Sequence, residues 1–284
     1  MKKQNVALVL SSGGARGLAH IGAIEELEAQ GYNITSIAGC SMGALIGGIY
    51  AAGKLKEFRE WMKTIDRKKM LELTDFSLSL NHIAKGTRII ETIMKFVPDV
   101  MIEDLPIPYC AIATDWNTGK EVVFREGSLF EAIRASISLP SFYEPVRRDG
   151  MILIDGGVTN PIPLNRVVRQ EGDILVGVDV SGHDYAAQSE LQHEIAEKRK
   201  RSTSLSQQIL NKLLPDNLDF NYYTMLSRVS SILIRQNSIL MAKLTKPDIL
   251  VDIQLARYGG FDYDKSEKLI AIGRQKTLQT LNQE

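Results

Sequence analysis

Short continuous apolar runs and longer helical stretches alternate along the first part of the chain. Apolar runs occupy 6–10 and 34–38, and runs of this length next to turn residues are typical of buried parallel strands. Apolar residues recur at helical spacing over about 18–30, and the small residues at 44–52 are also helical in pattern. The first 53 residues therefore predict strand, helix, strand, helix, which begins a parallel α/β sheet with right-handed crossovers.

Similar patterns continue through the middle of the chain. Residues 54–97 are helical in pattern with two apolar faces, and Pro98 ends this stretch. Asn117-Thr118-Gly119 and Asp149-Gly150 predict hairpin turns. Pro161-Ile162-Pro163-Leu164 predicts the start of a helix, because proline is tolerated in a first turn. The other predicted elements are strands at 107–114, 121–124, 146–148, 151–154 and 174–180 and a helix at 129–135.

The C-terminal third is more polar. Residues 181–247 predict a variable helical region, which includes an amphipathic run from Met225 to Leu244. A strand at 249–255 and a terminal helix to about Leu281 follow it. We predict a single domain over 1–284, with a core at 5–180, this variable region, and a C-terminal strand and helix at 248–284.

Composition narrows the class of protein. The 284 residues are 44% hydrophobic, and 34 Lys and Arg balance 34 Asp and Glu, so we expect no nucleic-acid partner. Cys40 and Cys110 form neither a disulfide framework nor a zinc spacing, which favours a reducing compartment and no metal. The apolar run after the basic start is too short for the hydrophobic region of a signal peptide. No apolar run in the sequence approaches the length of about 18 residues that a membrane-spanning helix needs. We therefore expect a cytoplasmic protein.

The stretch Gly39-Cys40-Ser41-Met42-Gly43 lies between a predicted strand and a predicted helix. This is the context of a G-x-S-x-G nucleophile elbow, in which a tight turn strains the serine backbone and the neighbouring glycines avoid clashes. Ser41 is the candidate nucleophile, at a helix N-terminus that favours developing negative charge. The alternative is a glycine-rich strand-to-helix turn with an incidental serine.

A second glycine turn, Gly13-Gly14-Ala15-Arg16, follows the first predicted strand. Backbone N–H groups at such a strand-to-helix turn point outward, so Gly13, Gly14 and Ala15 are candidate oxyanion donors, with charge from Arg16 nearby. The alternative is a phosphate-binding loop, but the Walker lysine and the G-x-G-x-x-G spacing are both missing. We expect this turn to meet the elbow where the carboxyl ends of parallel strands line one sheet edge.

The third glycine turn, Asp155-Gly156-Gly157, supplies the candidate general base. Asp155 stands at the end of a predicted strand, and burial can raise the pKa of a carboxylate towards working pH. The chain order Ser41, Asp155, His183 also fits an α/β-hydrolase triad, but only two strands fit before the elbow, which argues against that fold. The bland alternative for Asp155 is an ordinary turn aspartate.

The chain resembles the bacterial patatin-like phospholipases. The matching blocks are 13–22, 39–43, 135–140 and 155–163, in order and with their spacing. The resemblance implies a three-layer α/β/α sandwich around a mostly parallel sheet, and a Ser–Asp dyad without histidine. Carried over, Ser41 is the nucleophile, Asp155 is the base, and the amides from Gly13 to Arg16 form the oxyanion hole.

Such a protein is expected to hydrolyse fatty acyl esters of phospholipids or lysophospholipids through an acyl-Ser41 intermediate, without a cofactor. An acyltransferase and a non-catalytic regulatory module are the alternatives. The basic run 198–201 indicates either peripheral membrane contact or a solvated helix face. A homodimer is also left open. The walls of an acyl cleft are sought in 54–97 and 225–244, both of which also fit ordinary core packing.

Overall fold

The computed structural model describes residues 4–75, 84–140, 142–182, 222–255, 257–260 and 262–283. Its strands are β1 (Asn5–Leu10), β2 (Asn33–Cys40), β3 (Tyr109–Asp115), β4 (Glu121–Phe124), β5 (Val146–Arg148), β6 (Met151–Asp155), β7 (Ile174–Gly182) and β8 (Ile249–Gln254). Its α-helices are α1 (Ala19–Ala29), α2 (Met42–Ala51), α3 (Leu55–Lys63), α4 (Arg67–Leu73), α5 (Thr87–Met94), α6 (Leu129–Ser136), α9 (Tyr222–Thr245) and α10 (Ser266–Leu281). Short 3₁₀ helices include η1 (Gly14–Leu18) and η3 (Gly156–Val158).

One eight-stranded sheet runs in the order β5-β6-β3-β2-β1-β7-β8, and β4 pairs with β3 beside this path. In the run β3-β2-β1-β7-β8, each strand is parallel to the next. The β3–β4, β3–β6 and β5–β6 pairs are antiparallel. The predicted class, an α/β protein with a mostly parallel sheet, is confirmed.

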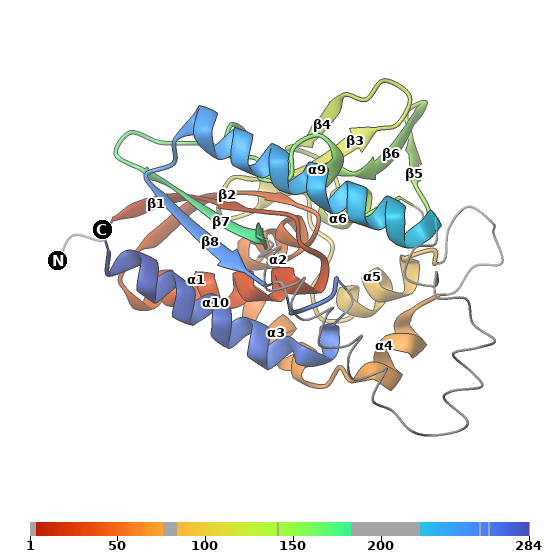
Figure 1. The fold of residues 1–284 in the computed structure, drawn as a ribbon, viewed down its shortest axis with the longest axis horizontal. Helices are drawn as coiled ribbons and strands as arrows, with labels where there is room; N and C mark the ends of the chain where they lie inside the picture. The colour runs from red at the N-terminus through yellow and green to blue at the C-terminus, as the bar shows by residue number, and fades with distance from the viewer. Residues whose placement is uncertain are drawn as a thin grey trace, which may run out of the picture.

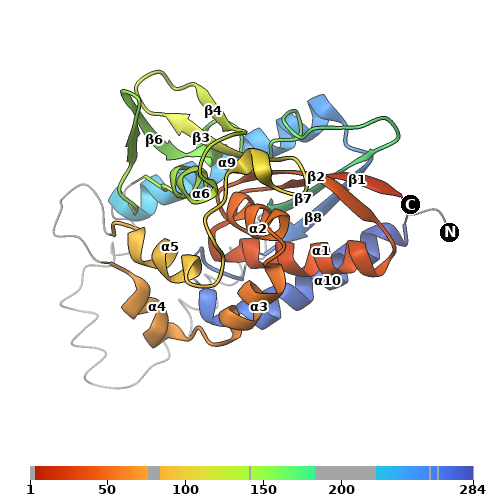
Figure 2. The ribbon, with the colours of Figure 1, turned by 180° about the vertical axis from the view of Figure 1, so that it is seen from behind.

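Helices cover both faces of the sheet, so the predicted three-layer arrangement is also confirmed. In Figure 1, α9 lies across one face, and the view from behind in Figure 2 brings α1 and α2 to the front on the other. Alternate side chains of strand β1 pack into the two layers on either side of the sheet. Val6, Leu8 and Leu10 belong to the larger core, whereas Ala7 and Val9 belong to a smaller core on the α9 face.

The prediction that a helix begins at Pro161 is wrong. The chain from 161 to 170 consists of turns and bends, and the N–H of Leu164 donates to the carbonyl of Ile162 at 2.8 Å. Two prolines remove backbone donors, while Ile162 and Leu164 are both buried in the smaller core. The segment therefore packs against the sheet as irregular chain instead of forming a helix.

Two other expectations concern the C-terminal third of the chain. The amphipathic run within 181–247 is α9, whereas the basic run 198–201 lies outside the described residues. Every helix in the described ranges is too short or too polar to cross a membrane.

Candidate active site

Ser41 stands alone between the end of β2 and the start of α2. Its backbone has φ 54° and ψ −120°, a strained conformation for a residue with a side chain. The flanking glycines are required by close contacts. A Cβ on Gly39 would lie 2.4 Å from the carbonyl oxygen of Gly43, and one on Gly43 would lie 2.2 Å from that of Leu10. The second contact also sets the elbow against the end of β1.

The side chains of Ser41 and Asp155 meet directly. The Ser41 hydroxyl donates to Oδ2 of Asp155 at 2.6 Å, and the N–H of Gly157 donates to Oδ1 at 2.7 Å. Asp155 is only 4% exposed. This burial raises its pKa to about 6, although the hydrogen bonds from Ser41 and Gly157 act in the opposite direction. The carboxyl group thus titrates close to neutral pH and contacts the serine hydroxyl.

The register of β3 explains how Asp155 reaches the elbow. Ile112 of β3 pairs with Cys40, the last residue of β2, so β3 continues beyond β2. Strand β6 runs antiparallel along this extension and ends with Asp155 opposite Ala113. A Cβ on Gly156 would lie 2.2 Å from the carbonyl oxygen of Ile112, so the turn after Asp155 lies flat against β3.

One part of the sequence argument needs correction here. The turn at Gly13-Gly14 and the elbow do follow the parallel strands β1 and β2. Asp155 does not follow a parallel strand, because β6 enters the site from the opposite direction. The three turns still converge, but the third arrives through an antiparallel strand that stops at the level of the elbow.

The end of α6 and the residues after it hold the backbones of Ser41 and Asp155 in place, which sequence reasoning missed. Oγ of Ser136 accepts the N–H of Ser41 at 2.9 Å, and the carbonyl of Ser138 accepts the N–H of Asp155 at 2.9 Å. Both serines are fully buried. In the sequence, the block 135–140 stands out only through the family resemblance. Two buried serines in a short apolar segment were the signal that could have given it a role.

The predicted oxyanion turn forms η1 and the residue before it. Gly13 has φ 176° and ψ 0°, and Gly14 has φ 56°. The N–H of Ala15 donates to the carbonyl of Gly260 at 2.8 Å, so this predicted donor has another partner here. Nε of Arg16 donates to the carbonyl of Gly13 at 3.2 Å, which ties the arginine to its own turn.

The histidines offer no base near Ser41 in the described residues. Nε2 of His20 donates to the carbonyl of Ser11 at 2.8 Å, and burial lowers the pKa of this imidazole to about 4. It is therefore a neutral group that ties α1 to the end of β1. His82, His183 and His193 lie outside the described residues, so a triad through His183 is not tested by the described part of the chain. No cluster of metal-binding side chains occurs within the described ranges.

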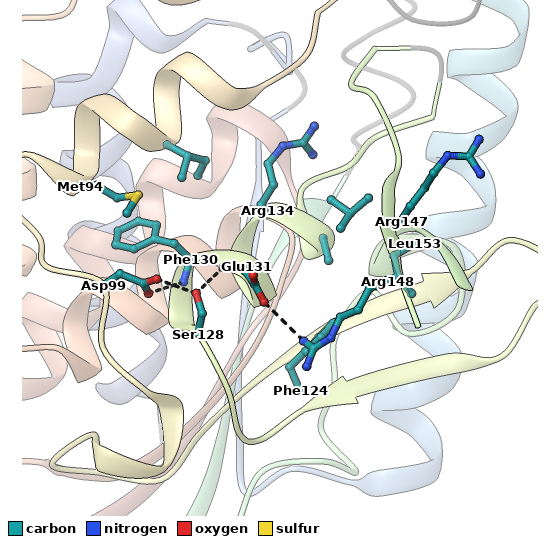
Figure 3. Close-up of a pocket in the computed structure, with 13 residues that line it drawn as sticks. Met94, Asp99, Phe124, Ser128, Phe130, Glu131, Arg134, Arg147, Arg148 and Leu153 are labelled. Carbon is teal, nitrogen blue, oxygen red and sulfur yellow. Dashed lines mark hydrogen bonds and ion pairs between the residues drawn. The ribbon is translucent and has the colours of Figure 1, made fainter. Parts of the chain in front are cut away.

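A cavity of about 470 Å³ (Figure 3) is lined in part by Ala135 and Leu153, which are close in sequence to Ser136 and Asp155. It is formed by α5, α6, β4, β5 and β6, and includes neither Ser41 nor Asp155. Ile90 and Met94 of α5 line it, so one predicted cleft wall does border a cavity, whereas none of the described side chains of α9 lines it. Figure 3 shows Arg148 reaching over Phe124 towards Glu131 at its rim.

These features define an α/β/α protein with a half-buried serine that is hydrogen-bonded to a buried carboxylate at a strand-to-helix elbow. The model of the patatin-like phospholipase family matches residues 8–168, and the chain belongs to this family. The predicted family is thereby confirmed.

Individual relatives agree with this assignment. An uncharacterized NTE family protein of Mycobacterium tuberculosis is 45% identical over 179 residues, which cover 63% of this chain and 50% of that protein. The neuropathy target esterase sws of Drosophila melanogaster is 32% identical over 187 residues, covering 63% of this chain and 13% of its own length. The chain therefore aligns with half or less of these relatives.

A solved structure shares the fold. The crystal structure of VipD from Legionella pneumophila superimposes with a TM-score of 0.52 at 15% sequence identity. The match covers all of this chain and 67% of VipD. At this identity the likeness concerns the fold alone.

Proposed function

We propose that this protein is a serine acyl hydrolase that cleaves fatty acyl esters of phospholipids or lysophospholipids through a Ser41–Asp155 dyad. The observation that carries the proposal is the 2.6 Å hydrogen bond from the Ser41 hydroxyl to the buried carboxylate of Asp155. Family membership supports the lipid substrate class. The elbow supports the choice of nucleophile, because its strained serine stands at the N-terminus of α2.

In the first half of the reaction, Oγ of Ser41 attacks the ester carbonyl carbon while Oδ2 of Asp155 takes the hydroxyl proton. The tetrahedral intermediate then collapses and breaks the bond to the alcohol oxygen. Asp155 returns its proton to this leaving alcohol. The products of this half are the free alcohol and an acyl ester on Ser41.

In the second half, water replaces the alcohol. Asp155 removes a proton from the water as its oxygen attacks the acyl carbon, and the second intermediate collapses with protonation of Oγ of Ser41. The hydrogen bond from Gly157 holds Oδ1, so Oδ2 keeps its direction towards the serine throughout. A carboxylate with a pKa of about 6 is ionised at pH 7 and still basic enough to accept the proton.

The developing oxyanion needs fixed donors near Ser41. We assign this role to the backbone N–H groups of Gly13 and Gly14, with positive charge from Arg16 close to the same turn. Gly43 of the elbow packs on Leu10, which places the end of β1 beside Ser41. The N–H of Ala15 joins this set only if its bond to Gly260 opens, since that bond now occupies the donor. Removing one such donor typically costs about 10²–10³ in rate.

Active-site labelling followed by product analysis tests the proposal. The wild-type protein should react with a fluorophosphonate probe and release fatty acid from a panel of phospholipid and lysophospholipid esters. Ser41→Ala should lose both activities, and Asp155→Asn should lose most of both. Rapid hydrolysis by Ser41→Ala would refute the assignment. Added alcohol or thiol acceptors distinguish the transferase alternative, because a transferase forms the acylated acceptor instead of free fatty acid.

A further inference from the structure

Helix α9 has an exposed apolar face. Its large hydrophobic side chains on this face are between 38% and 79% exposed, and at 100° per residue they fall within an arc of about 120°. We define the outer stripe of α9 as these six residues: Met225, Val229, Ile232, Leu233, Leu240 and Leu244. An exposed apolar row of this length marks an interaction surface.

The opposite face of α9 is packed against the candidate active site. The side chain of Ile234 lies over the turn after Asp155, 3.5 Å from the position of a Cβ on Gly157. Arg235 donates to Asp179 and to Asp252, each at 2.8 Å, and so attaches the helix to β7 and β8. The outer stripe therefore lies on the face of α9 that points away from the turn after Asp155.

The charge of α9 indicates what its outer stripe contacts. The 24 residues of the helix contain no Asp or Glu, and its charged residues are Arg228, Arg235 and Lys243. Lys243 is exposed and lies within the arc of the stripe, at the same angle as Met225, where a long side chain can extend from an apolar surface to anionic headgroups. A helix with an apolar stripe and only positive charge is typical of helices that lie in a membrane interface.

We propose that the outer stripe of α9 docks this protein on an anionic phospholipid surface. The proposal rests on the proposed lipid hydrolase function, because docking through α9 brings the dyad close to acyl esters held in that surface. Apolar side chains of the stripe enter the headgroup boundary, and Lys243 pairs with lipid phosphate. A second copy of this chain, or another segment of it, covering the same stripe are the competing outcomes.

Vesicle sedimentation tests this docking without hydrolysis. All proteins carry Ser41→Ala, and the probes are vesicles of phosphatidylcholine with and without phosphatidylglycerol. The Ser41→Ala protein should bind the mixed vesicles, and binding should weaken in high salt. Adding Leu233→Asp and Leu240→Asp should lower the affinity by about tenfold or more, since two apolar side chains leave the lipid. Lys243→Glu alone should also lower it by about tenfold.

Met101→Asp is the matched control, because Met101 is a 45% exposed hydrophobic residue outside α9. It should bind vesicles like the parent protein. The unfolding midpoint and the molar mass by light scattering are measured for every variant. Equal vesicle binding by the Leu233→Asp/Leu240→Asp variant overturns the proposal. So does a parent dimer that this variant converts to monomer, or a drop in its unfolding midpoint with no change in binding.

The dyad is tested separately with a water-soluble monomeric ester and active Ser41. Hydrolysis of that ester with no vesicle binding leaves the proposed function intact and refutes the docking surface. Vesicle binding through the stripe with no hydrolysis of any ester leaves the docking surface intact and refutes the proposed function.

Discussion

The backbone N–H of Ser41 donates to Oγ of Ser136, 2.9 Å away. This hydroxyl in turn donates to the carbonyl of Ile112 at 2.6 Å, so the elbow is tied to β3 through one buried side chain. Two residues later, the carbonyl of Ser138 accepts the N–H of Asp155. One short segment therefore fixes the serine and the carboxylate relative to each other.

Ser136→Ala should lower kcat for ester hydrolysis by about 10- to 100-fold with little change in KM. The substitution leaves the half-buried N–H of Ser41 without its acceptor, and small displacements of a reacting atom are costly. Steady-state kinetics on a soluble ester measures the effect. Ser138→Ala is the control, because this equally buried hydroxyl bonds to Arg134 and not to the elbow. Equal losses of kcat in both variants would show that Ser136 is merely structural.

The pH profile of kcat/KM should report Asp155. Its pKa of about 6 means that the base is ionised above this pH and protonated below it. We expect kcat/KM to fall about tenfold per pH unit below pH 6 and to level off above it. A stopped assay with a substrate that does not itself titrate gives the profile. An acidic limb near pH 4 would mean that Asp155 is not the base.

The raised pKa of Asp155 also makes folding stability depend on pH, and the direction is opposite to that of a carboxylate whose pKa is lowered by folding. The unfolded chain holds Asp155 at a pKa of about 3.9, so between about pH 4 and 6 the folded state binds more protons. Stability from this group is therefore present at low pH and lost as pH rises through 6. Asp155→Asn removes this loss and should be more stable than the wild type at pH 7, by about 2–3 kcal/mol.

Denaturant titrations at pH 5 and pH 7 check this prediction. The gain of the Asn variant should be larger at pH 7 than at pH 5. The Asn side chain can still accept the N–H of Gly157 through its oxygen, and it then presents an NH₂ group to Ser41. A variant that is less stable than the wild type at pH 7 would contradict the assignment of a costly buried charge.

Ser41→Gly should be more stable than Ser41→Ala. At φ 54° and ψ −120° any side chain is strained, and glycine relieves a cost of about 1–3 kcal/mol. Both variants lose the hydroxyl, so their difference isolates the backbone. Unfolding midpoints of the two proteins, measured side by side, provide the comparison. Equal midpoints would mean that the elbow holds no strain.

Arg235→Ala should destabilise the protein by about 3–5 kcal/mol and expose α9 to proteolysis. Its loss leaves Asp179, which is 3% exposed, as a buried charge without its arginine. Arg169→Ala is the matched control, since the Arg169–Asp248 pair is about half exposed and should cost about 1 kcal/mol or less. Unfolding curves and limited proteolysis measure both, and similar losses would refute a special role of the α9 anchor.

Local patterns were enough to predict much of this protein. The apolar runs of β1 and β2, the strained serine between Gly39 and Gly43, and the hairpin turn at Asp149-Gly150 each depend on residues close in sequence. The helix expected at Pro161 failed because the burial of Ile162 and Leu164 in the smaller core outweighed a local start signal.

The sequence by itself therefore determined the α/β class, the elbow and the choice of Asp155 as the candidate partner of Ser41. Only the tertiary structure decided how they meet, through an antiparallel β6 that ends opposite Ala113. It also decided that Ser136 holds the elbow and that Gly260 occupies the N–H of Ala15. These are contacts between segments far apart in the chain, and their geometry depends on strand register and packing, which local periodicity does not encode.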